Sequence, residues 1–309
     1  MHISKENLTE NRSNCPVCQS ANKSILISLK HNSQGFIDFI KFEPFYSKSF
    51  YENYHNGPLN EFLYEVAECN DCHFIYLTQI LSDVGMGQLY NDWLDKNLLK
   101  EYYSKLEYNT YEETMLSLLK KSYRKNEKIN LIDFGAGYGN FCSIAIKLKF
   151  TTYAFDLSDD KNEHLDSMGV TIINNLDKYN TFFDFIYVNQ VFEHVADPKS
   201  ILTKLRQCLT SHGLIYIAVP DCKNAKAILK SEGLSNNFFK LISPHQHING
   251  FTNETLCLLG VKSCLKPLSM FDFFQFYNTS LNFSEFKFLL KKTIKNSNFN
   301  TGLFFKKEM

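Results

Sequence analysis

The sequence has no surplus of charge, since its 309 residues include 33 Lys and Arg residues and 33 Asp and Glu residues. Proteins that bind nucleic acid usually draw on an excess of positive charge, which this chain lacks. Arginine is also scarce: the sequence has only Arg12, Arg124 and Arg206. Few planar guanidinium groups are therefore available to grip phosphates or base edges. We expect no nucleic-acid partner.

Long hydrophobic runs are absent as well. No stretch approaches the roughly 20 apolar residues of a membrane-spanning helix, and the opening MHISKENLTENRSN lacks the apolar segment of a secretory signal. We therefore expect a cytoplasmic protein without a membrane span. Hydrophobic residues still make up 44% of the chain, enough for a large core, and the length favours two units or one core with an appendage.

Residues 126–309 alternate short apolar runs with helical stretches. The expected strands are 129–135, 151–156, 182–191 and 213–220. The expected helices between them are 140–150 and 200–209. This alternation predicts an α/β fold with a parallel, doubly wound sheet covered by helices on both faces. Further closing strands are expected after residue 271, most clearly at 303–305, and ligands should bind beyond the carboxyl ends of the strands.

The clearest motif is LIDFGAGYGNF, in which three glycines follow an expected buried strand. Gly135, Gly137 and Gly139 lack a Cβ atom, so the backbone can adopt left-handed angles and approach a ligand closely. Their GxGxG spacing differs from the GxGxxG of dinucleotide-binding turns and argues against NAD. Asp156, at the end of the next strand, can accept hydrogen bonds from ribose hydroxyls. A turn without a ligand, and a helix-capping role for Asp156, are the alternatives.

Three segments together resemble class I S-adenosylmethionine-dependent methyltransferases: DFGAGYGNF, FDLS and YVNQVFEHVADPKSILTKLRQCLTSHGLIYIAVPD. The resemblance covers residues 129–260. It implies a Rossmann-like methyltransferase sheet, methyltransferase activity and S-adenosylmethionine as cofactor. The residues that it implies for cofactor binding are Asp133, Gly135, Ala136, Gly137, Gly139, Asp156, Leu157, Asn189 and Gln190.

The same resemblance implies a role for each part of this set. The glycine turn should line the methionine part of the cofactor, and Asp133 should hold the turn or the cofactor's ammonium group. Asp156 and Leu157 should contact the ribose and adenine, while Asn189 and Gln190 should lie at the methionine end. The neighbouring Glu193-His194 pair belongs to the resembling segment too, with bracing of its loop as the structural alternative.

Four of the nine cysteines form two CxxC pairs, Cys15 with Cys18 and Cys69 with Cys72. Four thiolates make a closed tetrahedral site suited to structural Zn²⁺, and such a site fits a reducing compartment better than disulfides do. A redox-active pair and free thiols are the alternatives. The many aromatic residues between the two pairs are expected to form a small core rather than a ring-stacking surface.

The segment AECNDCHFIYLTQIL adds a second resemblance. It is similar to part of the amino-terminal zinc-binding module of methyltransferases from sugar and cell-surface polysaccharide pathways. We therefore expect a small zinc-binding module at 1–85, a helical linker or lid at 86–125, and a methyltransferase domain at 126–309. The resemblance also implies a small, carbohydrate-like acceptor.

Two histidines in SPHQHINGFTNETL are candidate bases. The segment resembles one in sugar C-methyltransferases that reads Tyr-His-Glu-His, whose last His acts as base. That position is His247 here, and Pro244 and Gln246 replace the Tyr and Glu, which weakens the case for C-methylation. Transfer to a hydroxyl requires removal of its proton, and neutral imidazole is suited to this near pH 7. His247 is the first candidate and His245 the second; a pair that braces a loop is the alternative.

These features together predict an enzyme that moves the methyl group of S-adenosylmethionine to a hydroxyl of a small metabolite. A sugar, nucleotide sugar or glycan precursor is the expected acceptor. C- or N-methylation on the same scaffold, and a catalytically silent cofactor-binding partner protein, are the alternatives. The sequence leaves the oligomeric state open.

Overall fold

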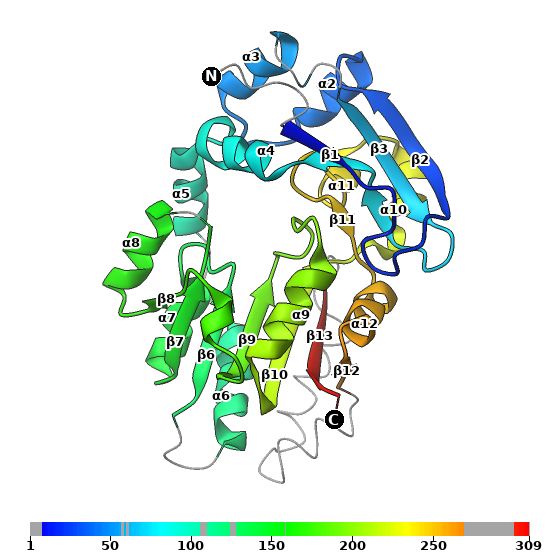
Figure 1. Ribbon diagram of the computed structural model, residues 1–309. Coiled ribbons are helices and arrows are strands. Elements are labelled where there is room, and N and C mark those ends of the chain that lie inside the picture. The colour runs from blue at the N-terminus through cyan, green and yellow to red at the C-terminus, as the bar shows by residue number, and fades with distance from the viewer. Residues whose placement is uncertain are drawn as a thin grey trace. The chain divides into compact units, whose positions relative to one another are not determined.

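The computed structural model describes residues 8–56, 59, 62–105, 110–123, 128–157, 159–268 and 300–308. The chain divides into two compact units, each formed from several segments (Figure 1). Unit 1 comprises Met1–Leu106, Glu193–Asp197 and Pro220–Thr255. Unit 2 comprises Glu107–Phe192, Pro198–Val219 and Leu256–Met309. Two segments from the second half of the chain thus belong with the amino-terminal third.

Unit 2 is built on a seven-stranded sheet with the order β12-β13-β10-β9-β6-β7-β8 (Figure 1). The strands are β6 (Asn130–Phe134), β7 (Thr151–Phe155), β8 (Thr171–Ile172), β9 (Phe183–Asn189), β10 (Leu209–Pro220), β12 (Leu265–Pro267) and β13 (Asn300–Lys307). The helices between them are α6 (Thr110–Ser122), α7 (Asn140–Lys147), α8 (Asp159–Ser167), η3 (Leu176–Lys178), α9 (Pro198–Cys208) and α12 (Asn253–Lys262). The expected α/β alternation is confirmed.

The central strands are buried on both faces, which explains why their sequences read as nearly continuous apolar runs. Strands β7, β6, β9 and β10 pair in parallel, and β8 extends this set beside β7. Helices α6 and α7 pack on one face through Met115 and Ile144, against Leu131 of β6 and Phe185 of β9. The strand order reverses between β6 and β9, and ligands of doubly wound sheets bind at such a reversal.

One edge of this sheet differs from the sequence prediction. The predicted parallel pairing does not extend to this edge, because β12 and β13 pair antiparallel, with Leu265 opposite Lys307. The strand expected at 303–305 lies within β13. Local pattern identifies such a strand but not its direction, which depends on its distant partner. The other expected closing segments, within 271–299, lie outside the described residues.

Unit 1 contains a four-stranded sheet, β11-β4-β3-β2, and a separate two-stranded sheet, β1-β5. Its strands are β1 (Thr9–Asn11), β2 (Lys23–Lys30), β3 (Leu63–Cys69), β4 (Ile75–Leu77), β5 (Gln79–Leu81) and β11 (Asn249–Gly250). Its helices are α2 (Gln34–Ile40), α3 (Lys48–Asn56), α4 (Asp83–Gln88), η2 (Leu89–Trp93), α5 (Lys96–Ser104), η4 (Cys222–Asn224), α10 (Ala225–Glu232) and α11 (Asn236–Phe239). The short strand β11 joins this sheet by antiparallel pairing with β4.

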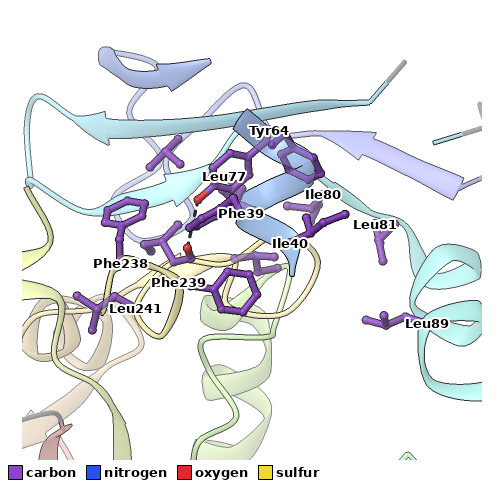
Figure 2. Close-up of a cluster of buried hydrophobic side chains, with 14 of the residues drawn as sticks. Phe39, Ile40, Tyr64, Leu77, Ile80, Leu81, Leu89, Phe238, Phe239 and Leu241 are labelled. Atoms are coloured by element: carbon purple, nitrogen blue, oxygen red, sulfur yellow. Dashed lines mark hydrogen bonds between the residues drawn. The ribbon is translucent and has the colours of Figure 1, made fainter. Parts of the chain in front are cut away.

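The core of unit 1 is rich in aromatic side chains (Figure 2). Phe39 of α2 packs against Tyr64 of β3 and Phe239 of α11, with ring centroids 5.4 and 5.1 Å away. The buried Tyr64 hydroxyl donates a hydrogen bond of 3.1 Å to the Ile242 carbonyl, as the dashed line in Figure 2 marks. Aromatic residues between the cysteine pairs, such as the fully buried Phe50, belong to this core. The expectation of a packing role for them is confirmed.

The helical stretch expected as a linker, 86–125, is divided between the two units. Helix α5 belongs to unit 1 and α6 to unit 2. Among the described residues, no helix has both the length and the apolar composition that a membrane span requires.

Candidate functional site

The glycine turn links β6 to α7, and each of its glycines has a left-handed backbone. Their φ angles are +83° at Gly135, +55° at Gly137 and +79° at Gly139. A Cβ atom at Gly135 would lie 2.4 Å from Val191 Cγ2, and one at Gly139 would lie 2.6 Å from Leu165 Cδ2. A Cβ atom at Gly137 would meet no protein atom within 4 Å. Packing therefore accounts for two of the glycines, while open space lies beside the third.

Asp156 follows β7 and stabilises the glycine turn. Its Oδ2 accepts a hydrogen bond of 2.8 Å from the backbone N–H of Gly137, and its Oδ1 lies 3.2 Å from Lys161 Nζ of α8. Each carboxylate oxygen can accept a further hydrogen bond. The next residue, Leu157, is 83% exposed and presents an apolar surface beside this carboxylate. The sequence prediction missed Lys161, although a cation one helical turn after a strand-end acid was a usable signal.

Asn189 and Gln190 lie at the carboxyl end of β9, the strand beside β6. Gln190 has a left-handed backbone, with φ +56°, although its N–H still donates to the Ala218 carbonyl at 2.8 Å. Such an angle is uncommon for a residue with a side chain. The Gln190 Nε2 atom is buried and has no hydrogen-bond partner in the described part of the chain. Because buried donors are normally paired, this amide is a candidate ligand contact.

Asp133 is buried within β6, and Cys142 Sγ of α7 donates to its Oδ2 at 3.5 Å. Burial, together with the nearby Glu112 carboxylate, raises the pKa of Asp133 to about 8. The carboxyl group is therefore mainly protonated at neutral pH. A neutral carboxyl group gives little charge stabilisation to an ammonium group, so its geometry favours the other expected role, holding the turn and the start of α7.

The four cysteines of the two CxxC pairs come together in unit 1. Cys15 Sγ lies 3.6 Å from Cys72 Sγ, and Cys18 Sγ lies 3.5 Å from Cys69 Sγ. All four sulfur atoms lie within 4.8 Å of one another. A tetrahedral zinc ion with Zn–S bonds of about 2.3 Å separates its sulfur ligands by about 3.8 Å. The donor set and its spacing therefore fit one zinc ion.

Both cysteine pairs adopt the same local turn. The residue after each pair has a left-handed backbone, with φ +67° at Gln19 and +62° at His73. In each turn this residue's N–H donates to the carbonyl of the first cysteine, at 2.9 and 2.8 Å. The N–H of the first cysteine in turn donates to the Ser20 or Phe74 carbonyl, at 2.8 and 2.9 Å. Two matching turns thus present two thiols each.

His245 lies in an aromatic part of unit 1 and is 1% exposed. Its Nδ1 is 3.1 Å from the Tyr46 hydroxyl, and its ring lies edge-on to His31 with centroids 5.5 Å apart. Burial lowers the pKa of His245 to about 3. The side chain is therefore neutral at neutral pH and packed as a core residue.

His247, two residues later, has different surroundings. Its Nδ1 lies 2.8 Å from the Lys240 carbonyl, and its ring lies 5.0 Å from the ring of His194. Burial lowers the pKa of His247 to about 4 and raises the pKa of Glu193 to about 8. His247 thus shares a cluster with Glu193 and His194. Both candidate bases belong to unit 1, whereas the residues expected to bind the cofactor belong to unit 2.

Arg12 has a structural role that the sequence analysis did not predict. Its guanidinium donates to three oxygen atoms at 2.8 Å each, the Leu77 and Ile248 carbonyls and Asn249 Oδ1. Asn249 Nδ2 donates to the Val195 carbonyl. Arg12 therefore ties the start of the cysteine-containing segment to the backbone that follows His247. No local sequence pattern signals these contacts, since the partners lie 65 or more residues away along the chain.

Solved structures that are similar to this chain include two methyltransferases. The plantazolicin methyltransferase BamL, in complex with a triazolic desmethylPZN analog and SAH, has a TM-score of 0.50 and 17% identity, covering 72% of this chain and 94% of that chain. An S-adenosylmethionine-dependent methyltransferase from Clostridium acetobutylicum has a TM-score of 0.45 and 10% identity, covering 69% of this chain and 99% of that chain. No curated protein matches the sequence.

A family model described as a methyltransferase domain matches residues 104–262. This match covers more than half of the chain, including the glycine turn, Asp156, Gln190 and both candidate bases. The likeness to methyltransferases expected from the sequence is confirmed at the level of the family. The chain therefore belongs to the methyltransferase-domain family, and the protein is a methyltransferase enzyme.

Proposed function

We propose that the enzyme transfers the methyl group of S-adenosylmethionine to an oxygen atom of a small metabolite. The observation that carries this proposal is the glycine turn, with open space beside Gly137 and the Asp156 carboxylate fastened to it. The turn follows β6 at the reversal of strand order, where doubly wound sheets bind nucleosides. The similar fold of BamL holds SAH.

The residues present fit this cofactor. We assign the methionine part to the open space at Gly137 and the buried amide of Gln190, which lacks a partner among the described residues. Asp156 would accept hydrogen bonds from ribose hydroxyls, and the exposed Leu157 would pack on the adenine. Asn189 completes the set at the end of β9. When bound, S-adenosylmethionine supplies an electrophilic methyl group on its sulfonium sulfur.

We assign the removal of the acceptor's proton to His247. Transfer forms a bond between the methyl carbon and the acceptor oxygen as the bond between that carbon and the sulfonium sulfur breaks, and the hydroxyl proton must pass to a base. The His247 ring is neutral, and with Nδ1–H donating to the Lys240 carbonyl, Nε2 has a free lone pair for that proton. His245 is the second candidate, but its near-complete burial and its contact with Tyr46 suit it less well.

We further propose that Cys15, Cys18, Cys69 and Cys72 bind one structural zinc ion. The support is the spacing of the four sulfur atoms. Four protein ligands leave no open coordination position, so this ion would stabilise unit 1 and would not activate water. We propose that residues 1–85 form the zinc-binding part of unit 1, and we propose a cytoplasmic location.

The acceptor class rests on the resemblance of the second cysteine pair to modules of polysaccharide-pathway enzymes. We propose a sugar, nucleotide sugar or glycan precursor as acceptor. C- or N-methylation uses the same cofactor and the same fold, so the acceptor atom must be identified from the product.

The test is a transfer assay with S-adenosylmethionine carrying a labelled methyl group, run against panels of sugar nucleotides, peptides and amino acids. We expect label in a sugar nucleotide or glycan precursor, with an O-methyl signal in the NMR spectrum of the product. A C-methyl or N-methyl signal would contradict oxygen as acceptor atom. Saturable cofactor binding without transfer to any acceptor would instead favour a silent binding protein.

A further inference from the structure

Glu193, His194 and His247 form a cluster that the proposed methyl transfer uses only through His247. The three residues come from two segments of unit 1. One side-chain donor atom from each lies within 4.8 Å of the other two. The Glu193 and His194 side chains have no role yet in the chemistry assigned above.

The carboxyl group of Glu193 is the member of this cluster that most needs a further binding partner. Its side chain is fully buried, and neither Oε1 nor Oε2 has a hydrogen-bond partner in the described part of the chain. His194 Nε2 lies 3.8 Å from Oε1, which is too far for a hydrogen bond. Burial of a carboxyl group without hydrogen-bond partners is unfavourable, because its contacts with water are lost and not replaced. A bound cation would remove this cost.

The surrounding contacts hold the cluster in place. The Glu193 carbonyl accepts hydrogen bonds from the N–H groups of Ile248 and Asn249, at 2.8 and 3.1 Å. These bonds fix the backbone of Glu193 to the backbone that follows His247. The contact between His247 Nδ1 and the Lys240 carbonyl orients the ring and directs the Nε2 lone pair away from that carbonyl. Metal-binding histidines are typically oriented in this way, by a backbone carbonyl at the other ring nitrogen.

We propose that Glu193, His194 and His247 bind a divalent transition-metal ion, at a site separate from the four cysteines. Two imidazoles and one carboxylate suit Zn²⁺, Co²⁺ or Mn²⁺, whereas Mg²⁺ and Ca²⁺ prefer oxygen ligands. Metal–ligand bonds of about 2.0–2.2 Å require donor atoms about 3.3 Å apart. Glu193 Oε1 and His194 Nε2 lie 3.8 Å apart. A small rotation of either side chain would shorten this distance to the value required.

Two further features suit an ion that enters from solvent. The His194 side chain is 23% exposed, so one side of the cluster is accessible. Three protein ligands leave at least one coordination position open for water or for an oxygen of a bound molecule.

A bound ion would occupy His247 Nε2, so metal binding and the role of His247 as a free base exclude each other. The site goes beyond methyl transfer, because its occupation requires neither cofactor nor acceptor.

The test is a titration of the metal-free full chain with Co²⁺, without S-adenosylmethionine or acceptor. We expect two equivalents to bind. The four-cysteine site gives intense sulfur-to-cobalt charge-transfer bands, whereas a site of nitrogen and oxygen ligands gives only weak d–d bands, so the two sites are distinguishable in one spectrum. Mg²⁺ at the same concentrations should leave the second site free.

The variant Glu193→Gln keeps the size of the side chain and removes its charge. We expect it to retain the first equivalent and to bind the second at least about tenfold more weakly. Glu43→Gln is the matched control, since Glu43 is a half-buried carboxylate of unit 1 that accepts hydrogen bonds from Phe45 N and Gln246 Nε2; it should bind two equivalents. Retention of the cysteine-site bands shows that a variant is folded. If Glu193→Gln loses these bands, His194→Gln replaces it as the variant that tests the second site. Binding of a single equivalent by the wild-type chain, or unchanged binding of the second by folded Glu193→Gln and His194→Gln, would overturn the proposal.

Discussion

Substitution of Gly137 by Ala tests whether the open space in the glycine turn holds the cofactor. The new Cβ atom would meet no protein atom within 4 Å, so its steric effect on the folded chain is small. The φ angle of +55° is left-handed, and a residue with a side chain adopts it at a cost of about 1–2 kcal/mol. We expect Tm to fall by a few degrees.

The same Cβ atom should obstruct a cofactor that approaches the backbone at this point. Insertion of one methyl group into a packed contact costs about 1–3 kcal/mol, which corresponds to an affinity loss of roughly 5-fold to 150-fold. Gly169→Ala is the matched control, because Gly169 has a φ angle of +81° and equally open surroundings but lies after α8, outside the turn. It should show a similar fall in Tm with unchanged cofactor affinity.

Calorimetric titration with S-adenosylmethionine measures the affinity of both variants, and differential scanning measures their Tm. We expect weakened binding in Gly137→Ala alone. Equal affinity in Gly137→Ala, Gly169→Ala and the wild-type chain would refute the placement of the cofactor at the turn, because a methyl group added in the open space would then obstruct no ligand.

Four further predictions concern single residues. Asp156→Ala should weaken S-adenosylmethionine binding by about tenfold or more in calorimetry, since it removes the acceptor for ribose hydroxyls and for the Gly137 N–H; unchanged affinity would dismiss its ribose role. Cys69→Ser should lower both the zinc content found by elemental analysis and the Tm, and a full zinc equivalent would contradict the four-cysteine site. The contribution of Asp133 to the free energy of unfolding should fall as pH rises from about 4 to about 8, by up to about 1.4 kcal/mol per pH unit, because Asp133 ionises in the unfolded chain near 3.8 but in the folded chain only near 8. Urea unfolding should therefore give different slopes against pH for the wild-type chain and Asp133→Asn, and identical slopes would show that Asp133 makes no such contribution. His247→Ala should lower turnover by about 10²-fold to 10⁴-fold at constant cofactor affinity, and wild-type turnover would exclude it as the base.

The segment from β6 to β7 could be predicted from the sequence because its determinants are local. A buried apolar run, three glycines and an acid at the next strand end are consecutive features, and each acts within its own element. The structure accordingly places Gly137 and Asp156 in hydrogen-bond contact. The left-handed backbone of Gln190 had no such signal, since glutamine carries no preference for that conformation.

The composition of unit 1 could not be predicted, because it depends on contacts between distant segments. Strand β11 is only two residues long, too short for a periodic pattern, yet it pairs with β4 and brings the His247 segment into this unit. Arg12 reinforces the same arrangement through Ile248 and Asn249. Neither the pairing nor this triple hydrogen bond has a local sequence signature.

The two candidate bases illustrate the same limit at the scale of single side chains. His245 and His247 are two residues apart and have the same chemistry, so the sequence ranked them only by resemblance. Their environments differ because the backbone at His245 is left-handed, with φ +68°, and its ring packs beside Tyr46, whereas the ring of His247 lies beside His194. Burial and tertiary partners, rather than residue type, separate the two histidines.

The most direct test of cofactor use is a calorimetric titration of the full chain with S-adenosylmethionine and, separately, with NAD. We predict saturable binding of one S-adenosylmethionine per chain and no binding of NAD, since the GxGxG turn does not have the spacing of a pyrophosphate site. Binding of NAD, or of neither compound, would contradict the assignment of S-adenosylmethionine as the cofactor of this methyltransferase.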